Sequence, residues 1–296
     1  MRESVVTVIE AIRLSRQNGR NSSNPIRIAS PIWRYLTYLL VLTSPLSIAE
    51  NRTAIPVTHG AVQQANLMEF NDDGTISGFK HHFVEALAQR LNWSTQHRHC
   101  PFQRCLYTMA DGTTDLMVFV TATQDRHHYL DFIQVWPNTR SIPFYVRQGE
   151  QSRLQRYEDL HQLRVGVVNG YVYFPRFDKD PAIEKITVIK ETQLARMLLA
   201  NRIDTYIAYD AVSPDDNPDQ SIVRAPYAQP FKNSAFLAIS KKSPLSQQLD
   251  LIEQTVIEMM ADGTIETLWR LEFPDQNFPY PLEPRPRFSR SESAQE

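Results

Sequence analysis

The chain has 296 residues, a hydrophobic content of 42% and a formal net charge of −2. This composition is ordinary for a globular protein. The nearly neutral charge gives no indication of a polybasic surface that would bind nucleic acid. We therefore do not expect nucleic acid as a partner.

The first 49 residues are expected to form a leader and a signal peptide. Arg34 precedes an apolar core, Tyr35 to Leu42, and Ser47 and Ala49 occupy the −3 and −1 positions of a cleavage site. This order is typical of a secretory signal, and the apolar run is shorter than the about 20 residues of a membrane span. We therefore expect export to the periplasm, with an uncleaved N-terminal anchor as the alternative.

Strand and helix patterns alternate along the rest of the chain, which predicts an α/β fold. In the helix expected at 78–93, Phe79, Phe83, Leu87 and Leu91 recur at steps of four, as in an amphipathic helix. The other elements expected in this half are strands at 53–60, 94–99, 114–120 and 142–147 and a short helix at 101–112.

The pattern restarts after a polar connector at 147–162. Ser243 and Pro244 fit the cap and the first position of a long helix that Ala-Asp-Gly at 261–263 interrupts. The remaining elements expected are strands at 163–170, 186–190, 204–210 and 234–240, a helix at 191–202 and a loop at 213–220.

This order of elements predicts a first lobe that is interrupted by a second. The chain is expected to cross between the lobes near 145–152 and to return near 229–235, which gives a hinge of two crossing strands beside a ligand cleft. The predicted boundaries are 52–147 and 233–275 for lobe 1, 148–232 for lobe 2, and 276–296 for a loose tail.

The two cysteines, Cys100 and Cys105, are close in sequence. In an oxidising compartment such a pair is bridged more often than free. Because Pro101 suits the first turn of a helix, Cys100 would lie just outside it, where the two sulfurs can approach. We expect a disulfide, with two free thiols as the alternative.

Six segments resemble, in order and spacing, the bacterial extracellular solute-binding protein family 3, the polar amino acid-binding proteins that serve ABC importers. They are DDGTISGFKHHFVEALAQRLNW, RCLYTMADGTTDLM, TATQDRHHYLDF, EDLHQLRVGVVNGYVY, NRIDTYIAYD and ADGTIETLWRLEF. The resemblance covers about residues 52–275. It implies a type II periplasmic-binding-protein fold, in which two α/β lobes close on a ligand.

The resemblance also implies a carboxylate site in TATQDR. Arg126 would grip the ligand's carboxylate with the two parallel bonds of its guanidinium, and Thr121 would add its backbone N–H and hydroxyl. The start of the following helix would add partial positive charge. The alternative for Arg126 is a surface ion pair with Asp125 or Asp131.

Two first-lobe positions depart from the family pattern. Phe119 stands where amino acid binders frequently have a serine, and Met68 stands where an aromatic ring frequently stacks on the ligand. The alternative for Met68 is a place in the core. Both residues make the expected site more apolar than that of an arginine or glutamine binder.

The second lobe departs as well. Tyr171 and Val172 replace a Ser/Thr pair that often completes the carboxylate site, and the acid that binds the ammonium would fall near Tyr209 or Asp210. A ligand with a carboxylate and an apolar or aromatic body fits this set.

The resemblance therefore implies a monomeric periplasmic binding protein that delivers a small ligand to a membrane ABC permease, without a cofactor and without enzymatic activity. The first alternative is a dehydratase-like enzyme on the same fold, for which Asp210, Glu191 and His59 are the candidate acid or base groups. The second is a soluble partner that reports ligand binding to a membrane receptor.

Six of the eight histidines come in close pairs, which raises the question of a metal site. His97 and His99 share one face of a strand, whereas the adjacent His81 and His82 cannot both face one ion. No set of histidines and acids has a recognised ligand spacing along the chain. We therefore expect no metal.

Overall fold

The computed structural model describes residues 53–64, 66–138, 141–208, 219–230, 233–274 and 278. The predicted signal peptide lies outside these residues, as do most of the loop at 213–220, Tyr209, Asp210 and all of the predicted tail except Phe278. Within the described ranges, no helix has both the length and the apolar character that crossing a membrane requires.

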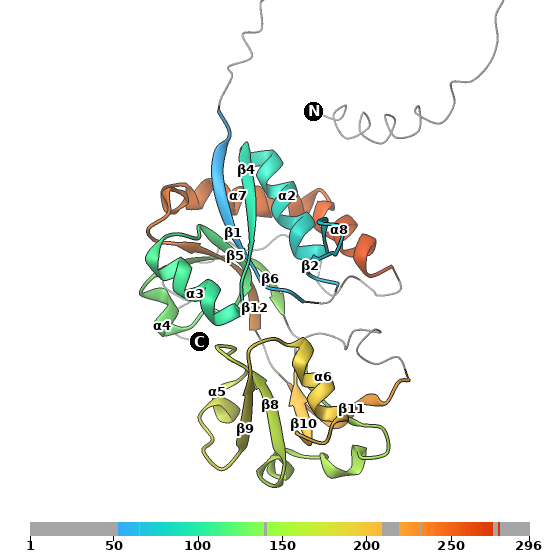
Figure 1. Ribbon diagram of the computed structural model, residues 1–296. Helices are drawn as coiled ribbons and strands as arrows, with labels where there is room; N and C mark the ends of the chain where they lie inside the picture. The colour runs from blue at the N-terminus through green and yellow to red at the C-terminus, as the bar shows by residue number, and fades with distance from the viewer. Residues whose placement is uncertain are drawn as a thin grey trace, which may run out of the picture. The chain divides into compact units, whose positions relative to one another are not determined.

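Two mixed five-stranded sheets form two lobes (Figure 1). The first sheet has the order β4-β1-β5-β12-β6, in which β1 runs parallel to β4 and β5, and β12 runs antiparallel to β5 and β6. Its strands are β1 (Ile55–Ala61), β4 (Trp93–His99), β5 (Leu116–Val120), β6 (Leu130–Asn138) and β12 (Asn233–Ser240).

The helices of the first lobe bury their apolar faces against this sheet. The predicted amphipathic helix is confirmed, and Phe79, Phe83 and Leu87 are completely buried in one core with residues of β5, β12 and the last two helices. The elements that accompany the sheet are β2 (Glu69–Phe70), β3 (Ile76–Ser77), α2 (Phe79–Leu91), α3 (Phe102–Asp111), α4 (Gln124–His127), η4 (Pro244–Gln248), α7 (Leu249–Ala261) and α8 (Thr264–Glu272).

The second sheet has the order β11-β7-β10-β8-β9, with β8 parallel to β9 and β10, and β7 antiparallel to β10 and β11. Its strands are β7 (Ser141–Arg147), β8 (Arg164–Val168), β9 (Glu184–Val188), β10 (Thr205–Ile207) and β11 (Ile222–Pro230). The helices of this lobe are η1 (Gln151–Arg153), η2 (Tyr157–Gln162), α5 (Pro175–Asp178) and α6 (Thr192–Leu199).

The chain passes between the sheets twice. β6 ends at Asn138 and β7 begins at Ser141, while β11 ends at Pro230 and β12 begins at Asn233. The two passages are neighbours, because Asn233 pairs with Asn138 and Pro230 pairs with Ser141. A division by sheet therefore assigns β7 to the second lobe, whereas the boundaries 52–147, 148–232 and 233–275 stay a prediction.

The start of the last helical region agrees with its sequence signals. The Ser243 hydroxyl accepts a hydrogen bond from the Leu245 amide at 3.2 Å, and Pro244 occupies the first turn of η4. The break at 261–263 separates α7 from α8, with Gly263 in the left-handed region at a φ of 79°. The cap and the break are confirmed, whereas the long helix begins only at Leu249, after the short 3-10 helix η4.

Gly78 permits the turn that leads into α2. Its φ is 100°, and a Cβ there would lie 2.5 Å from the backbone carbon of Leu67. Gly74 also has a positive φ, 82°, but a Cβ there would meet no atom within 4 Å.

We expect Gly74→Ala to lower the free energy of unfolding by about 1 kcal/mol, the cost of a positive φ. Gly78→Ala adds a backbone clash and should cost about 3 kcal/mol. Urea unfolding followed by circular dichroism measures both values. Equal losses in the two variants would contradict the close approach at Gly78.

Candidate functional site

The end of β5 is irregular at Phe119. β12 pairs Phe236 with Val120 and Leu237 with Val118, so its register skips Phe119, which has a φ of 63°. A positive φ is rare for a bulky residue, and bulges at strand ends commonly re-aim a side chain. The Phe119 ring stacks on Phe79 with 5.8 Å between ring centroids. It thus faces the first turn of α2.

The turn after β5 holds Arg126 in a buried position. The Thr123 hydroxyl caps α4 by accepting from the Arg126 amide at 3.3 Å, and the guanidinium Nη1 donates to the Thr121 carbonyl at 2.7 Å. Arg126 is 5% exposed, and its Cζ lies 5.4 Å from the centre of the Phe102 ring. This burial argues against the alternative of a surface arginine.

The second amino group of Arg126 reaches the second lobe. Its Nη2 donates to the carbonyl of Gly170 at 2.7 Å, just after β8. The helix that follows Thr123 has only four residues, so the partial positive charge expected from its start is small. The guanidinium is therefore the main positive group of this turn, and its role toward a ligand stays a prediction.

Tyr171 continues this contact between the lobes. Its ring packs edge to face on Phe102 with 4.7 Å between centroids, and its hydroxyl donates to Oε2 of Glu191 at 3.3 Å. The same carboxylate oxygen accepts a hydrogen bond from Gln64 Nε2 at 3.1 Å. Glu191 is thus joined both to its own lobe and to the first.

Lys80 extends this polar chain on the first lobe. Its ammonium donates to Oε1 of Gln64, and it also lies 5.3 Å from the centre of the Phe119 ring. Gln64 thus joins Lys80 in the first lobe to Glu191 in the second.

The structure gathers most of the predicted ligand residues around these contacts. Phe119, Thr121 and Arg126 follow one another at the end of β5, and Tyr171 meets them through Phe102. Val172 is half-buried next to Tyr171. Tyr209 and Asp210 lie outside the described residues.

Met68 is completely buried, as its core alternative expects. Its amide donates to the Gln64 carbonyl at 2.8 Å, which closes the loop before β2. This backbone bond ties Met68 to the residue that reaches Glu191.

Three residues at the contact between the lobes carried no sequence signal for a place there. Gln64 follows β1, Phe102 begins α3, and Gly170 was expected only as a strand end. Folding brings each of them to its partner. Gln64 binds Glu191, while Phe102 and Gly170 both contact Arg126. Backbone carbonyls such as that of Gly170 are invisible in a residue pattern.

His59, a candidate acid or base group of the dehydratase-like alternative, is buried inside the first lobe. It is 2% exposed in β1, and its Nδ1 lies 2.8 Å from Nδ1 of His97 in β4. Burial, followed by the neighbouring His97 and Lys80, holds the pKa of His59 well below its usual value. Because its side chain is enclosed in the first lobe, His59 has little access to a bound ligand.

The predicted disulfide is confirmed. Cys100 and Cys105 are bonded, with 5.6 Å between their Cα atoms, and Cys100 lies just before the Pro101 cap of α3. The bridge holds the first turn of α3, which carries Phe102 under the Arg126 guanidinium.

The two α/β lobes have the type II periplasmic-binding-protein fold, and a buried guanidinium and a carboxylate lie at the contact between them. The chain matches the bacterial extracellular solute-binding proteins, family 3, over residues 57–271, and it belongs to this family. The family is one of solute-binding proteins. No curated protein is significantly similar to the chain in sequence.

Solved structures share the fold. A mutant of ArgBP from T. maritima is 19% identical, with a TM-score of 0.65 over 76% of this chain and 96% of the other. The substrate-binding protein of an amino acid ABC transporter is 17% identical, with a TM-score of 0.63 over 74% of this chain and 100% of the other. A histidine kinase sensor domain is 14% identical, with a TM-score of 0.61 over 74% of this chain and 95% of the other.

We expect the Cys100→Ala/Cys105→Ala variant to lose about 2 kcal/mol of unfolding free energy, the value for a short closed loop. Urea unfolding with and without reductant checks this. Reductant should destabilise the wild-type protein and leave the double variant unchanged. Equal effects of reductant on both proteins would contradict a stabilising bridge.

Proposed function

We propose that this protein captures a small amino acid-like ligand, whose carboxylate binds Arg126, and delivers it to an ABC permease. The observation that supports this most is the buried guanidinium of Arg126 at the contact between the lobes. In the proposed mechanism the lobes close on the ligand by movement at the two neighbouring passages between the sheets.

The carboxylate site follows from the present partners of Arg126. Nη1 bonds the Thr121 carbonyl in the first lobe, and Nη2 bonds the Gly170 carbonyl in the second. A carbonyl carries only a partial charge, whereas a carboxylate carries a full one in a shape that matches the guanidinium fork. A ligand carboxylate would replace the Gly170 carbonyl at Nη2, and the Thr121 bond would hold the side chain in place.

The ammonium site follows from Glu191. Gly170 accepts from Arg126, and the next residue, Tyr171, donates to Glu191. One dipeptide thus links a positive and a negative side chain, an arrangement that suits a zwitterion. The rings of Phe102, Phe119 and Tyr171 would pack on the apolar body of such a ligand. The predicted contribution of Asp210 or Tyr209 to the ammonium site is kept in this proposal.

The related structures support the ligand class and the transport role. ArgBP of T. maritima has been solved with arginine bound, and a second related structure serves an amino acid ABC transporter. We infer export to the periplasm by the predicted signal peptide, and action as a monomer. The kinship with a histidine kinase sensor domain makes ligand reporting to a membrane receptor the second candidate.

A thermal-shift screen with amino acids and organic acids would identify the ligand for the following tests. Arg126→Ala should weaken its binding about a hundredfold, because a buried charge pair loses several kcal/mol when one partner is removed. Isothermal titration calorimetry measures the affinity. Arg176→Ala is the control, since this arginine is exposed and pairs with Glu158. Unchanged affinity in Arg126→Ala contradicts the carboxylate site.

Glu191→Gln separates the two ends of the ligand. We expect about tenfold weaker binding of the zwitterion and no change for the analogue that lacks its ammonium group, because only the charge of Glu191 is removed. Glu158→Gln is the matched control on the surface of the same lobe. Equal loss for both ligands in Glu191→Gln would mean that this residue does not recognise the ammonium.

A further inference from the structure

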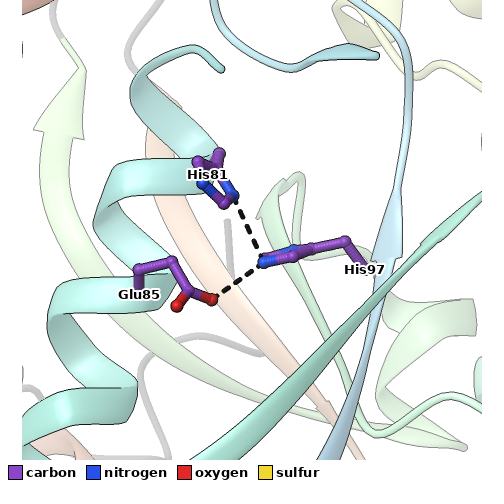
Figure 2. A group of neighbouring side chains, drawn as sticks. All are labelled: His81, Glu85 and His97. Carbon is purple, nitrogen blue, oxygen red and sulfur yellow. Dashed lines mark hydrogen bonds and ion pairs between the residues drawn. The ribbon is translucent and has the colours of Figure 1, made fainter. Parts of the chain in front are cut away.

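Three side chains with metal-ligand atoms meet at the edge of the first sheet. His81 and Glu85 lie one turn apart on α2, and His97 on the edge strand β4 faces them (Figure 2). Their ligand atoms all lie within 4.8 Å of one another, and no second group of this kind is found in the part of the chain that the structure describes. The group shares no residue with the proposed ligand site.

Two of the three distances between ligand atoms are close to those of a coordination sphere. Nε2 of His97 lies 3.2 Å from Nδ1 of His81 and 2.9 Å from Oε1 of Glu85. Ligand atoms of a tetrahedral zinc ion, with bonds of about 2.0–2.1 Å, are about 3.3 Å apart. His97 Nε2 therefore already lies at nearly the required separation from both other ligand atoms, and all three atoms lie within 4.8 Å of one another.

A single N–H on Nε2 of His97 cannot hydrogen-bond to both His81 and Glu85. A neutral imidazole has one N–H, and a proton on Nε2 of His97 points along one line, toward Glu85 or toward His81. When the proton is instead on Nδ1 and bonds His59, the lone pair of Nε2 faces the Glu85 carboxylate. A cation between the three atoms satisfies all of them at once.

Residues behind the group orient it. Nδ1 of His97 lies 2.8 Å from Nδ1 of the buried His59, its direct neighbour in the β1–β4 register. Metal-bound histidines nearly always donate their other N–H to an acceptor, usually a carboxylate, a carbonyl or water, and this fixes the tautomer. Here the ring nitrogen of His59 is placed to accept it. The Thr95 hydroxyl likewise donates to Oε1 of Glu85.

The three-residue group is buried on the side of His97 and open to solvent on the side of Glu85. The side chain of His97 is 7% exposed, whereas that of Glu85 is 44% exposed. Two histidines and one glutamate leave a fourth position for water, an arrangement known for zinc. Nitrogen ligands favour zinc and neighbouring transition metals over magnesium and calcium, which prefer oxygen.

We propose that His81, Glu85 and His97 bind a divalent transition metal ion, with zinc as the best fit, and that the ion fastens the first half of α2 to β4. An ion that binds only the folded chain raises its stability by mass action. His82 takes no part, because its Nε2 pairs with Glu272 at 3.0 Å. It is therefore a control one residue away on the same helix.

The test is calorimetric titration of zinc chloride into the tag-free, chelator-treated protein. We expect one ion per chain with micromolar or tighter affinity, a higher melting temperature with zinc, and no heat from magnesium chloride. His81→Gln and Glu85→Gln should each weaken zinc binding at least tenfold and remove the rise in melting temperature. His82→Gln and Arg126→Ala should bind zinc as the wild-type protein does.

Two results would overturn the site. One is the absence of zinc binding by the wild-type protein at 1 mM, about a thousand times a micromolar Kd. The other is equal zinc affinity in His81→Gln and His82→Gln, which would mean that the ion binds elsewhere. Circular dichroism of each variant shows whether it is folded, and Glu85→Gln gives an independent reading if His81→Gln is not.

Discussion

Burial of the Arg126 charge is the constraint on which the structure at the end of β5 depends. A guanidinium out of water is costly unless its donors are bonded. The bulge at Phe119, the Thr123 cap and the ring of Phe102 together fix where it lies. The carbonyls of Thr121 and Gly170, which accept hydrogen bonds from it, belong to different lobes. The hydrogen bond to Gly170 therefore depends on the lobes being in contact.

Neighbouring residues of helix α2 make contacts on two different sides of the helix. Lys80 reaches Gln64 and the Phe119 ring, on the side of the proposed ligand site. His81 and Glu85 reach β4 instead. A metal ion on the second side would hold the helix that positions Lys80, while the ligand and the ion would bind separate side chains.

Much of the fold could be predicted from the sequence, because hydrophobic periodicity and turn residues report burial directly. The steps of four from Phe79 gave α2, and Ser243-Pro244 gave the start of the last helical region. β6 was not predicted, since Pro137 and the polar Asp131 and Gln134 interrupt its pattern, features that an edge strand tolerates. β11 was missed, and there the β7–β11 pairing determines the strand.

The site was only partly predictable for a different reason. Arg126 and Tyr171 stand in segments that resemble a family, so their neighbourhood could be expected. Gln64 and Gly170 make contacts with residues far apart in sequence. Moreover, every residue type has a backbone carbonyl, so the residue type at position 170 does not reveal this acceptor. His81, Glu85 and His97 do not match a recognised metal-ligand spacing along the chain. They come from a helix and a strand that only the fold brings together.

The most direct test of the central claim is a crystal structure of the protein with its tightest amino acid-like ligand. The account predicts both carboxylate oxygens within about 3.2 Å of the Arg126 guanidinium nitrogens, with the Gly170 carbonyl no longer on Nη2. A ligand carboxylate bound elsewhere, with Arg126 still on the Gly170 carbonyl, would contradict it.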